Sequence, residues 1–376
     1  MPEFHVREVA PGTDWVYESV HGLEVALSLE RFGEDLSASV EWNRSSHANE
    51  RDALKPLLLM LPGPAPTGAP LGRFGLPVAP DTPAELLGAV NAQLPTTDNL
   101  HLAEDVFCQV RADVRRGGIG TALWREIVRI ARQHGRTSVL GWSEHLLATA
   151  DADGGRVVPS AGEGWVPLDA GSRFAQAQGL QLAQVERQSR LDLPVPPHRL
   201  AGLRAQAETR ALPAYRTVSW VGPTPEEHLD RVATMYRALS TDAPTGDVDW
   251  QEENWDADRV RRSDRQKHLT GHSVFSLAIS AETGGAAGLT EIHVHDAHPH
   301  RPEQWTTVVA RSHRGHRLGL LLKVANLQLL ATDQPEALHL DTWNAGENEH
   351  MLAINNLLGY RPHSVHGAWQ LRLSHA

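Results

Sequence analysis

The feature that most constrains this chain is a glycine-bearing loop that occurs twice, each time between a buried strand and a helix. The first copy is VRRGGIGTALWREIVRIARQHG at residues 114–135, and the second is HRGHRLGLLLKVANLQLL at residues 313–330. At the start of a helix several backbone N–H groups have no partner in the helix, and the helix dipole adds roughly half a positive charge there. Each loop therefore predicts an anion site, and phosphate is the usual ligand of such a site.

The segments around the two loops follow one another in the same order, which indicates an internal duplication. Arg115 and Arg314, which open the two loops, are 199 positions apart (314 − 115). A helix that is apolar on nearly every side is expected after the second loop, and an amphipathic helix after the first. The strands expected in corresponding places are 4–10 and 215–221, 102–110 and 304–310, and 136–142 and 337–343.

The two halves differ in their loops and are joined by a proline-rich segment. A polar, glycine-rich insertion at 143–165 lengthens the first half, which is also interrupted by Pro- and Gly-rich loops before residue 84. The sequence PVPPH at 194–198 cannot continue a sheet and marks the linker. We therefore expect an N-terminal domain at 1–193, a linker with a helix at 194–212, and a C-terminal domain at 213–376.

The composition excludes several classes of function. A formal net charge of −11 argues against general nucleic-acid binding. The sequence has neither a run of eighteen apolar residues nor the pattern of a signal peptide, so we expect no membrane partner. Cys108 is the only cysteine, which fits a reducing cytoplasm. The chain is expected to be a monomer, in which the halves form an internal pseudo-dimer, or a homodimer.

Together, the loops and their flanking strands resemble the GNAT superfamily of acyl-CoA-dependent N-acetyltransferases, present twice in tandem. The family signature, Gln/Arg-x-x-Gly-x-Gly/Ala, is matched in full by RRGGIG at 115–120, whereas RGHRLG at 314–319 has Arg317 in place of the middle glycine. With TWNAGENEHMLAINNLLGY at 342–360, the second half resembles that of tandem actinobacterial acetyltransferases, the architecture of mycothiol synthase. The resemblance implies an α/β (α+β) fold. Each domain would be a mixed, largely antiparallel twisted sheet, flanked by helices and splayed between its fourth and fifth strands.

The resemblance also implies the binding mode of acetyl-CoA as the acyl donor. Backbone amides of the loops would hold the pyrophosphate, and the pantetheine arm would lie between the splayed strands. Asn344 and Asn348 could hydrogen-bond the pantetheine amides, or Asn348 could cap the helix that follows. The residues that the resemblance implies as cofactor-binding are Cys108, Val110, Arg115, Arg116, Gly117, Gly118, Ile119 and Gly120, and Thr307, Val309, Arg314, Gly315, His316, Arg317, Leu318, Gly319, Asn344 and Asn348.

Acetyl transfer needs a base for the attacking amine and an acid for the leaving thiolate. The stretch LAEDVFCQV before the first loop is similar to histone acetyltransferases, where the glutamate at the position of Glu104 is the general base. Glu303 lies at the matching place in the second half. The tyrosine that many members use as the acid is replaced by Ala175 and Asn355, so water or another group must serve. We expect the second half to carry turnover, and the first to be mainly structural or a second cofactor site.

A polar strand face in the second half carries Glu291, His293 and His295. Alternation along a strand places these three side chains on one face. Their spacing fits no common zinc site, so no metal is expected. The face either lines the acceptor cleft or is solvated.

These observations lead us to expect a soluble bacterial enzyme that transfers an acetyl group from acetyl-CoA to a small amine-bearing metabolite, by direct attack in a ternary complex. One alternative is the same fold with another acyl donor, such as a carrier-protein thioester, or with a hydroxyl acceptor. Another is a catalytically silent CoA-binding or scaffold protein, which the missing tyrosines favour.

Overall fold

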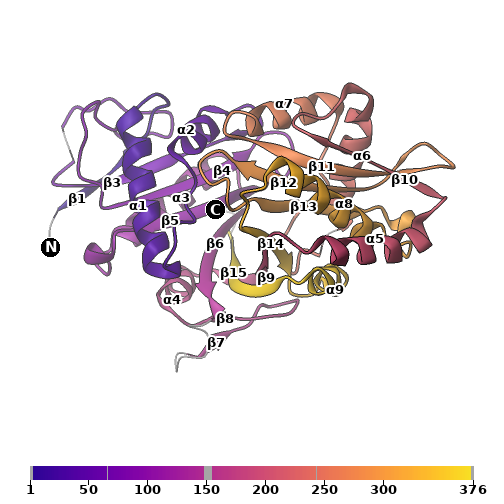
Figure 1. Ribbon diagram of the computed structural model, residues 1–376. Coiled ribbons are helices and arrows are strands. Elements are labelled where there is room, and N and C mark those ends of the chain that lie inside the picture. Colours follow the sequence, from indigo (N-terminus) through magenta and orange to yellow (C-terminus); the bar gives the residue numbers. More distant parts are fainter. Residues whose placement is uncertain (1–2, 66, 148–154, 243, 374–376) are drawn as a thin grey trace. The chain divides into compact units, whose positions relative to one another are not determined.

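The computed structural model describes residues 3–65, 67–147, 155–242 and 244–373 (Figure 1). Part of the predicted polar insertion, residues 148–154, lies outside the described residues. No helix in these ranges is long and apolar enough to cross a membrane. The chain forms two compact units that are not continuous in sequence. Unit 1 comprises Met1–Ala161, Trp165–Val185 and His366–Ala376, and unit 2 comprises Gly162–Gly164 and Glu186–Val365.

Unit 1 is a mixed sheet with helices on both faces. Strand β3 (Leu57–Pro62) packs its alternate side chains Leu57, Leu59 and Leu61 on helix α1 (Asp14–Phe32). The residues between them therefore point to the opposite face of the sheet. The sheet order is β1-β3-β4-β5-β6-β15, with β5 and β6 parallel. The elements are β1 (Phe4–Glu8), α1 (Asp14–Phe32), α2 (Val40–Ala48), β2 (Ala53–Leu54), β3 (Leu57–Pro62), β4 (Gly88–Pro95), β5 (Leu102–Val110), η1 (Ala112–Val114), α3 (Ile119–Gln133), β6 (Ser138–Leu146), β7 (Arg156–Val157), β8 (Val166–Pro167) and α4 (Ala170–Ala177).

Unit 2 repeats this plan. Its sheet order is β9-β14-β13-β12-β11-β10, and only the β13–β14 pair within this order is parallel. The elements that complete the chain are β9 (Gln181–Asp192), α5 (Pro197–Ala211), β10 (Tyr215–Val221), η3 (Glu226–His228), α6 (Leu229–Asp242), α7 (Ala257–Lys267), β11 (Gly271–Ser280), β12 (Ala286–His295), β13 (Glu303–Val309), η4 (Arg311–His313), α8 (Leu318–Asp333), β14 (His339–Ala345), α9 (Glu349–Leu358) and β15 (Arg361–Arg372).

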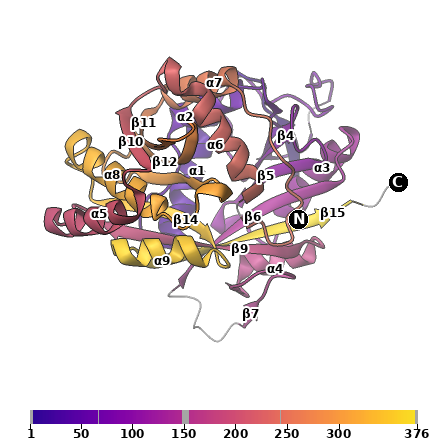
Figure 2. The ribbon, with the colours of Figure 1, turned by 90° about the vertical axis from the view of Figure 1, so that its right-hand side faces the viewer.

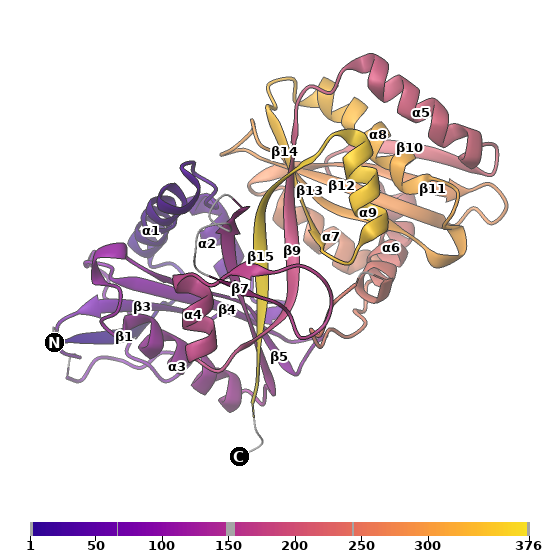
Figure 3. The same cartoon turned by 90° about the horizontal axis from the view of Figure 1, so that it is seen from below.

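The closing strands of the two halves are exchanged. In unit 2, β14 pairs along its whole length with β9, from His339↔Asp192 to Ala345↔Glu186. In unit 1, the neighbour of β6 is β15, whose residues from His366 onward belong to that unit. Figure 3 shows β9 and β15 as two long strands. Each unit therefore needs residues from both halves of the sequence, whereas the predicted domain ranges were continuous.

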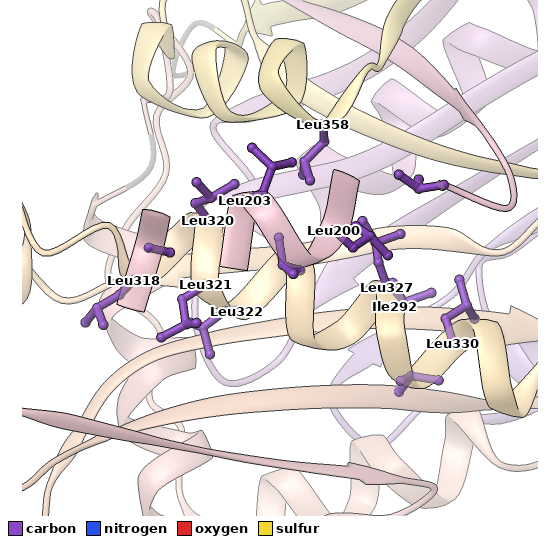
Figure 4. Packing of buried hydrophobic residues seen from close by; sticks show 14 of the residues in the cluster. Leu200, Leu203, Ile292, Leu318, Leu320, Leu321, Leu322, Leu327, Leu330 and Leu358 are labelled. Atoms are coloured by element: carbon purple, nitrogen blue, oxygen red, sulfur yellow. The ribbon is translucent and has the colours of Figure 1, made fainter. Parts of the chain in front are cut away.

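Helix α8 is buried on nearly all sides, as its sequence predicted, because α5 packs along it (Figure 2). Leu200 and Leu203 of α5 and Leu358 of α9 lie against the leucines of α8 (Figure 4). The linker predicted at 194–212 thus contains a helix that belongs to the core of unit 2. The helix that corresponds to α8 in unit 1 is α3, which is amphipathic.

Two parts of unit 1 differ from the sequence expectation. The stretch with Pro- and Gly-rich loops holds β3 and is followed by β4, and these two strands complete the sheet between β1 and β5. The strand expected to end at Trp142 continues to Leu146. Near its end lie the polar residues Ser143, Glu144 and His145, and a polar segment after a buried strand predicts a loop. In the structure these side chains have hydrogen-bond partners inside the unit.

Candidate functional site

In both units the two parallel strands separate after their first residues. In unit 2, β13 and β14 pair only at Glu303↔Asp341 and Gln304↔Thr342, although both strands continue. In unit 1, the last pair between β5 and β6 joins Val106 to Gly141. The splay predicted between the fourth and fifth strands is therefore confirmed in each unit.

A β-bulge lies at the start of each splay. In unit 2, Glu291 pairs with Thr306 whereas the next residue of β12 pairs with Gln304, which leaves Trp305 as the extra residue. In unit 1 the irregularity in β5 includes Asp105, whose φ is 50°. A bulge bends a strand and redirects its side chains, so it is a local cause of the separation.

The two glycine loops have matching backbone conformations. Each has two left-handed residues, Arg116 and Gly118 with φ of 64° and 89° in unit 1, and Gly315 and Arg317 with φ of 85° and 56° in unit 2. Each loop thus uses one arginine and one glycine, in opposite order. A left-handed conformation costs a non-glycine residue about 1–2 kcal/mol. Arg317 bears this cost and keeps the loop geometry that the middle glycine provides in unit 1.

The first arginine of each loop holds the loop to its own unit. Arg115 forms an ion pair of 2.6 Å with Glu30 at the end of α1, and its Nε donates to the carbonyl of the last residue of β5 (3.2 Å). Arg314 forms the same contacts with Asp242 at the end of α6 (2.9 Å) and with the last residue of β13 (3.3 Å). Both arginines were predicted to bind the cofactor, and in the structure both brace the loop.

The last glycine of each signature permits close packing. A Cβ atom on Gly120 would lie 3.2 Å from the ring of Phe174 in α4, and one on Gly319 would lie 3.0 Å from Ile354 in α9. Both glycines were predicted to bind the cofactor. In the structure they let the helix after the loop approach the next helix of its unit, α3 against α4 and α8 against α9.

The other predicted cofactor residues lie along the loops and the splayed strands. Burial raises the pKa of Cys108 to about 12, so its thiol stays protonated; its Sγ lies 3.8 Å from the carbonyl of Gly120. Thr307 Oγ1 lies 2.8 Å from Thr290 Oγ1. The ring of His316 lies against Tyr215. Exposed backbone is presented by Gly117, Gly118 and Gly315, and Arg317 is exposed as a residue. Ile119 and Leu318 are buried, and Val110 and Val309 are partly buried.

Glu303, the predicted base of unit 2, lies in a polar cluster at the start of β13. Its Oε2 accepts a hydrogen bond from Trp305 Nε1 (2.9 Å) and lies 3.4 Å from His295 Nε2. Burial alone would raise the pKa of Glu303. The hydrogen bond and charge of His295, the hydrogen bond of Trp305 and the charge of Arg301 outweigh burial and lower it to about 2. Glu303 is therefore a carboxylate at neutral pH and suited to orienting His295.

The strand face that carries Glu291 and His293 is buried, so its interpretation as solvated was wrong. Helices α6 and α7 cover it, and both side chains are at most 1% exposed. The Glu291 carboxylate accepts from Tyr236 Oη (2.7 Å), Lys267 Nζ (2.6 Å) and Ser273 Oγ (2.8 Å). Within the described part of the chain, no group of three or more His, Cys, Asp or Glu residues is placed to hold a metal ion.

In unit 1 a second acid accompanies the predicted base. The charge of Glu104 acts on Arg136, whose own pKa is lowered by burial. Asp105, in the irregular part of β5, accepts from Gln93 Nε2 (2.9 Å), and burial raises the pKa of this carboxyl. Sequence reasoning did not single out Asp105, because only the bulge distinguishes it from an ordinary strand residue.

Two consecutive hydrogen bonds between side chains link α8, α9 and β14 in unit 2. Lys323 Nζ donates to Asn355 Oδ1 (3.0 Å), and Asn355 Nδ2 donates to Asn344 Oδ1 (2.7 Å). Asn348 caps α9 by accepting from Met351 N (3.3 Å), which was one of its two predicted roles. Asn355, four residues before Gly359, thus joins a buried lysine to a strand beside the splay.

Replacing Lys323 by methionine should change how stability depends on pH. Burial lowers the pKa of Lys323 from 10.5 to about 7, so the unfolded chain binds this proton more tightly than the folded chain. The destabilisation is complete below the folded-state pKa and disappears as pH approaches the unfolded-state value. In denaturant titrations, the unfolding free energy of the wild type should rise relative to Lys323→Met between about pH 7 and 10. A difference independent of pH contradicts this.

Solved structures resemble the whole chain, although no family model and no curated protein sequence matches it. A tandem GNAT protein from the clavulanic acid biosynthesis pathway is 22% identical with a TM-score of 0.71, and the match covers 100% of both chains. A GCN5-related N-acetyltransferase from Sphaerobacter thermophilus is 14% identical, with a TM-score of 0.56 and coverage of 98% of this chain and 95% of that one.

A third similar structure is a GCN5-related glucosamine N-acetyltransferase region in a fungal multi-domain GH3 beta-N-acetylglucosaminidase. It is 14% identical with a TM-score of 0.59, and the match covers 99% of this chain but 38% of that one. At these identities the likeness shows the fold. The chain has a tandem GNAT fold, as its two loops predicted.

Proposed function

We propose that the protein transfers an acetyl group from acetyl-CoA to an amine of a small metabolite, by direct attack in a ternary complex. The observation that best supports this is the same in both units: two parallel strands separate beside a loop that presents backbone at a helix start. Such a loop suits a pyrophosphate. The unpaired strand edges suit an extended, amide-containing arm, because main-chain hydrogen bonds can be made there.

We assign turnover to unit 2, where His295 and Glu303 lie near the start of the splay. An imidazole exchanges protons near neutral pH, and a neighbouring carboxylate fixes its orientation and stabilises its protonated form. His295 would take the proton of the attacking amine, and Glu303 would position it. The leaving thiolate would take its proton from water, since Asn355 stands where the family has its tyrosine.

A catalytically silent CoA-binding protein is the second candidate. It is favoured by Ala175 and Asn355 at the tyrosine positions, since neither can protonate a thiolate. A screen of labelled acetyl-CoA with a library of amines, metabolite extract included, separates the two candidates. The same screen with hydroxyl acceptors and with carrier-protein thioesters identifies a different acceptor or donor. Transfer to any acceptor excludes the silent protein.

Titration calorimetry of the full chain tests coenzyme A binding. We expect between one and two molecules bound per chain, because two loops have the required geometry. Phosphate contacts should dominate the affinity. Desulfo-CoA should therefore bind comparably to coenzyme A, and pantetheine, which lacks the nucleotide phosphates, should bind far more weakly. Equal binding of desulfo-CoA and pantetheine contradicts the assignment of the loops.

A further inference from the structure

Three side chains of unit 1 form a serine–histidine–aspartate chain. Ser143 Oγ lies 2.7 Å from His145 Nε2, and His145 Nδ1 lies 2.6 Å from Asp169 Oδ2. A carboxylate only accepts, so Nδ1 carries the ring hydrogen and Nε2 accepts from the serine hydroxyl. This is the arrangement in which a hydroxyl becomes a nucleophile.

Trp369 fixes the direction of the serine hydroxyl. Its indole Nε1–H donates to Ser143 Oγ (2.7 Å), which leaves the hydroxyl hydrogen for His145. The same N–H can stabilise negative charge on Oγ as the proton leaves. Gly367 allows this approach, since a Cβ there would lie 2.8 Å from Trp369 Nε1 and 3.0 Å from Ser143 Oγ.

The imidazole and the carboxylate are held in place. His145 is 1% exposed. Asp169 Oδ1 caps α4 by accepting from the amides of Gly171 (2.9 Å) and Ser172 (3.1 Å), while Oδ2 faces the imidazole. Burial would raise the pKa of Asp169, but the hydrogen bond and charge of His145 and the two amides lower it. An ionised Asp169 therefore fixes the tautomer of His145.

Ser143 lies beside the splay of unit 1. The last pair between β5 and β6 joins Val106 to Gly141, so Ser143 is two residues beyond it, and it is half-buried. Ser143 follows the tryptophan of its strand directly, as Asn344 does in unit 2. Ser143 thus lies in the part of β6 that no longer pairs with β5, beside the gap that the proposed function assigns to a thioester arm.

We infer that Ser143 is an acyl-accepting nucleophile, which takes an acyl group from a thioester and forms a seryl ester in unit 1. Ser143 Oγ attacks the thioester carbonyl as its proton passes to His145 Nε2. The C–S bond then breaks, and the thiol leaves with that proton. An amine or water next attacks the ester and gives a proton to His145, which returns it to Oγ as the ester C–O bond breaks. The thioester rests on the proposed function, and the activated serine does not.

A fluorophosphonate probe tests the activation of Ser143 without coenzyme A, because such probes phosphonylate serines activated by an imidazole. The full chain should be labelled at Ser143, as located by mass spectrometry of its peptides, and Ser143→Ala should abolish this label. Ser160→Ala, which removes an exposed hydroxyl of the same unit, should leave the labelling rate unchanged.

Asp169→Asn is the matched variant that separates catalysis from structure. Asparagine is as good a helix cap as aspartate, so α4 is retained. Its amide would donate to His145 Nδ1, which moves the ring hydrogen to Nε2 and removes the acceptor for Ser143. The labelling rate should fall by about 10²–10⁴-fold, the contribution of a positioned base, while circular dichroism stays unchanged.

Incubation with acetyl-CoA should place one hydroxylamine-labile acetyl group on the Ser143 peptide, absent in Ser143→Ala. No label at Ser143 in the folded chain, equal labelling of the wild type and Asp169→Asn, or a label without acetylation in a chain that binds coenzyme A overturns the inference. Failure of the proposed function has a different signature, which is the absence of coenzyme A binding in calorimetry while fluorophosphonate labelling persists.

Discussion

Replacing Glu303 by glutamine should lower kcat at least tenfold and leave the affinity for coenzyme A nearly unchanged. Glutamine keeps the size of the side chain but removes the negative charge that faces His295 Nε2. A positioned base contributes about 10²–10⁴-fold to a rate, so losing its orientation costs a large part of that factor. Because the pKa of Glu303 is about 2, the wild-type carboxylate stays ionised over the whole pH range of the assay. Steady-state kinetics with labelled acetyl-CoA, together with calorimetry, measure both quantities.

Glu104→Gln is the control, since Glu104 is the corresponding acid of unit 1. The charge of Glu104 acts on Arg136. The Glu104→Gln variant should lower kcat by less than about threefold, well below the contribution of a positioned base. A larger loss in Glu104→Gln than in Glu303→Gln would reverse the roles of the two units. Turnover would then belong to the unit that contains Ser143.

Replacing Glu291 by glutamine should lower the free energy of unfolding by about 3–5 kcal/mol, because it removes one partner of a buried ion pair. The side chain is 1% exposed and accepts from Tyr236, Lys267 and Ser273. Without that charge, the Lys267 ammonium remains among the rings of α6, β11 and β13 and has lost the carboxylate with which it is directly paired. Denaturant titration of the full chain, followed by tryptophan fluorescence, measures the loss.

A matched control uses an ion pair at the surface. Glu30→Gln removes the partner of Arg115, and both side chains are well exposed. Exposed pairs contribute about 0–1 kcal/mol, so this variant should unfold nearly as the wild type does. Similar losses in Glu30→Gln and Glu291→Gln would show that the buried carboxylate does not compensate Lys267.

The repeated fold could be predicted because its signals are local. The strands predicted at 102–110 and 215–221 have the bounds that the structure has. The exchange of β9 and β15 could not be predicted. Both are long closing strands with similar patterns, and only the register with β14 and β6 distinguishes their partners.

The candidate site was predicted in outline for the same reason, and its side-chain chemistry was not. The glycine loops follow from sequence spacing. The lowered pKa of Glu303 depends on His295, which comes from a neighbouring strand. The Ser143–His145–Asp169 chain joins a strand end to a helix cap across the polar insertion, and sequence spacing does not reveal such proximity.

The exchange of closing strands sets the order in which the chain can fold while the ribosome makes it. Strand β6 is synthesised 220 residues (366 − 146) before the part of β15 that belongs to the same unit and is its neighbour in the sheet. At the usual pace of translation this interval lasts about 10–40 s, during which β6 keeps an open edge. The half that is begun first is therefore completed last. A gene divided between the halves would yield two polypeptides, each with an unfinished sheet until it met the other.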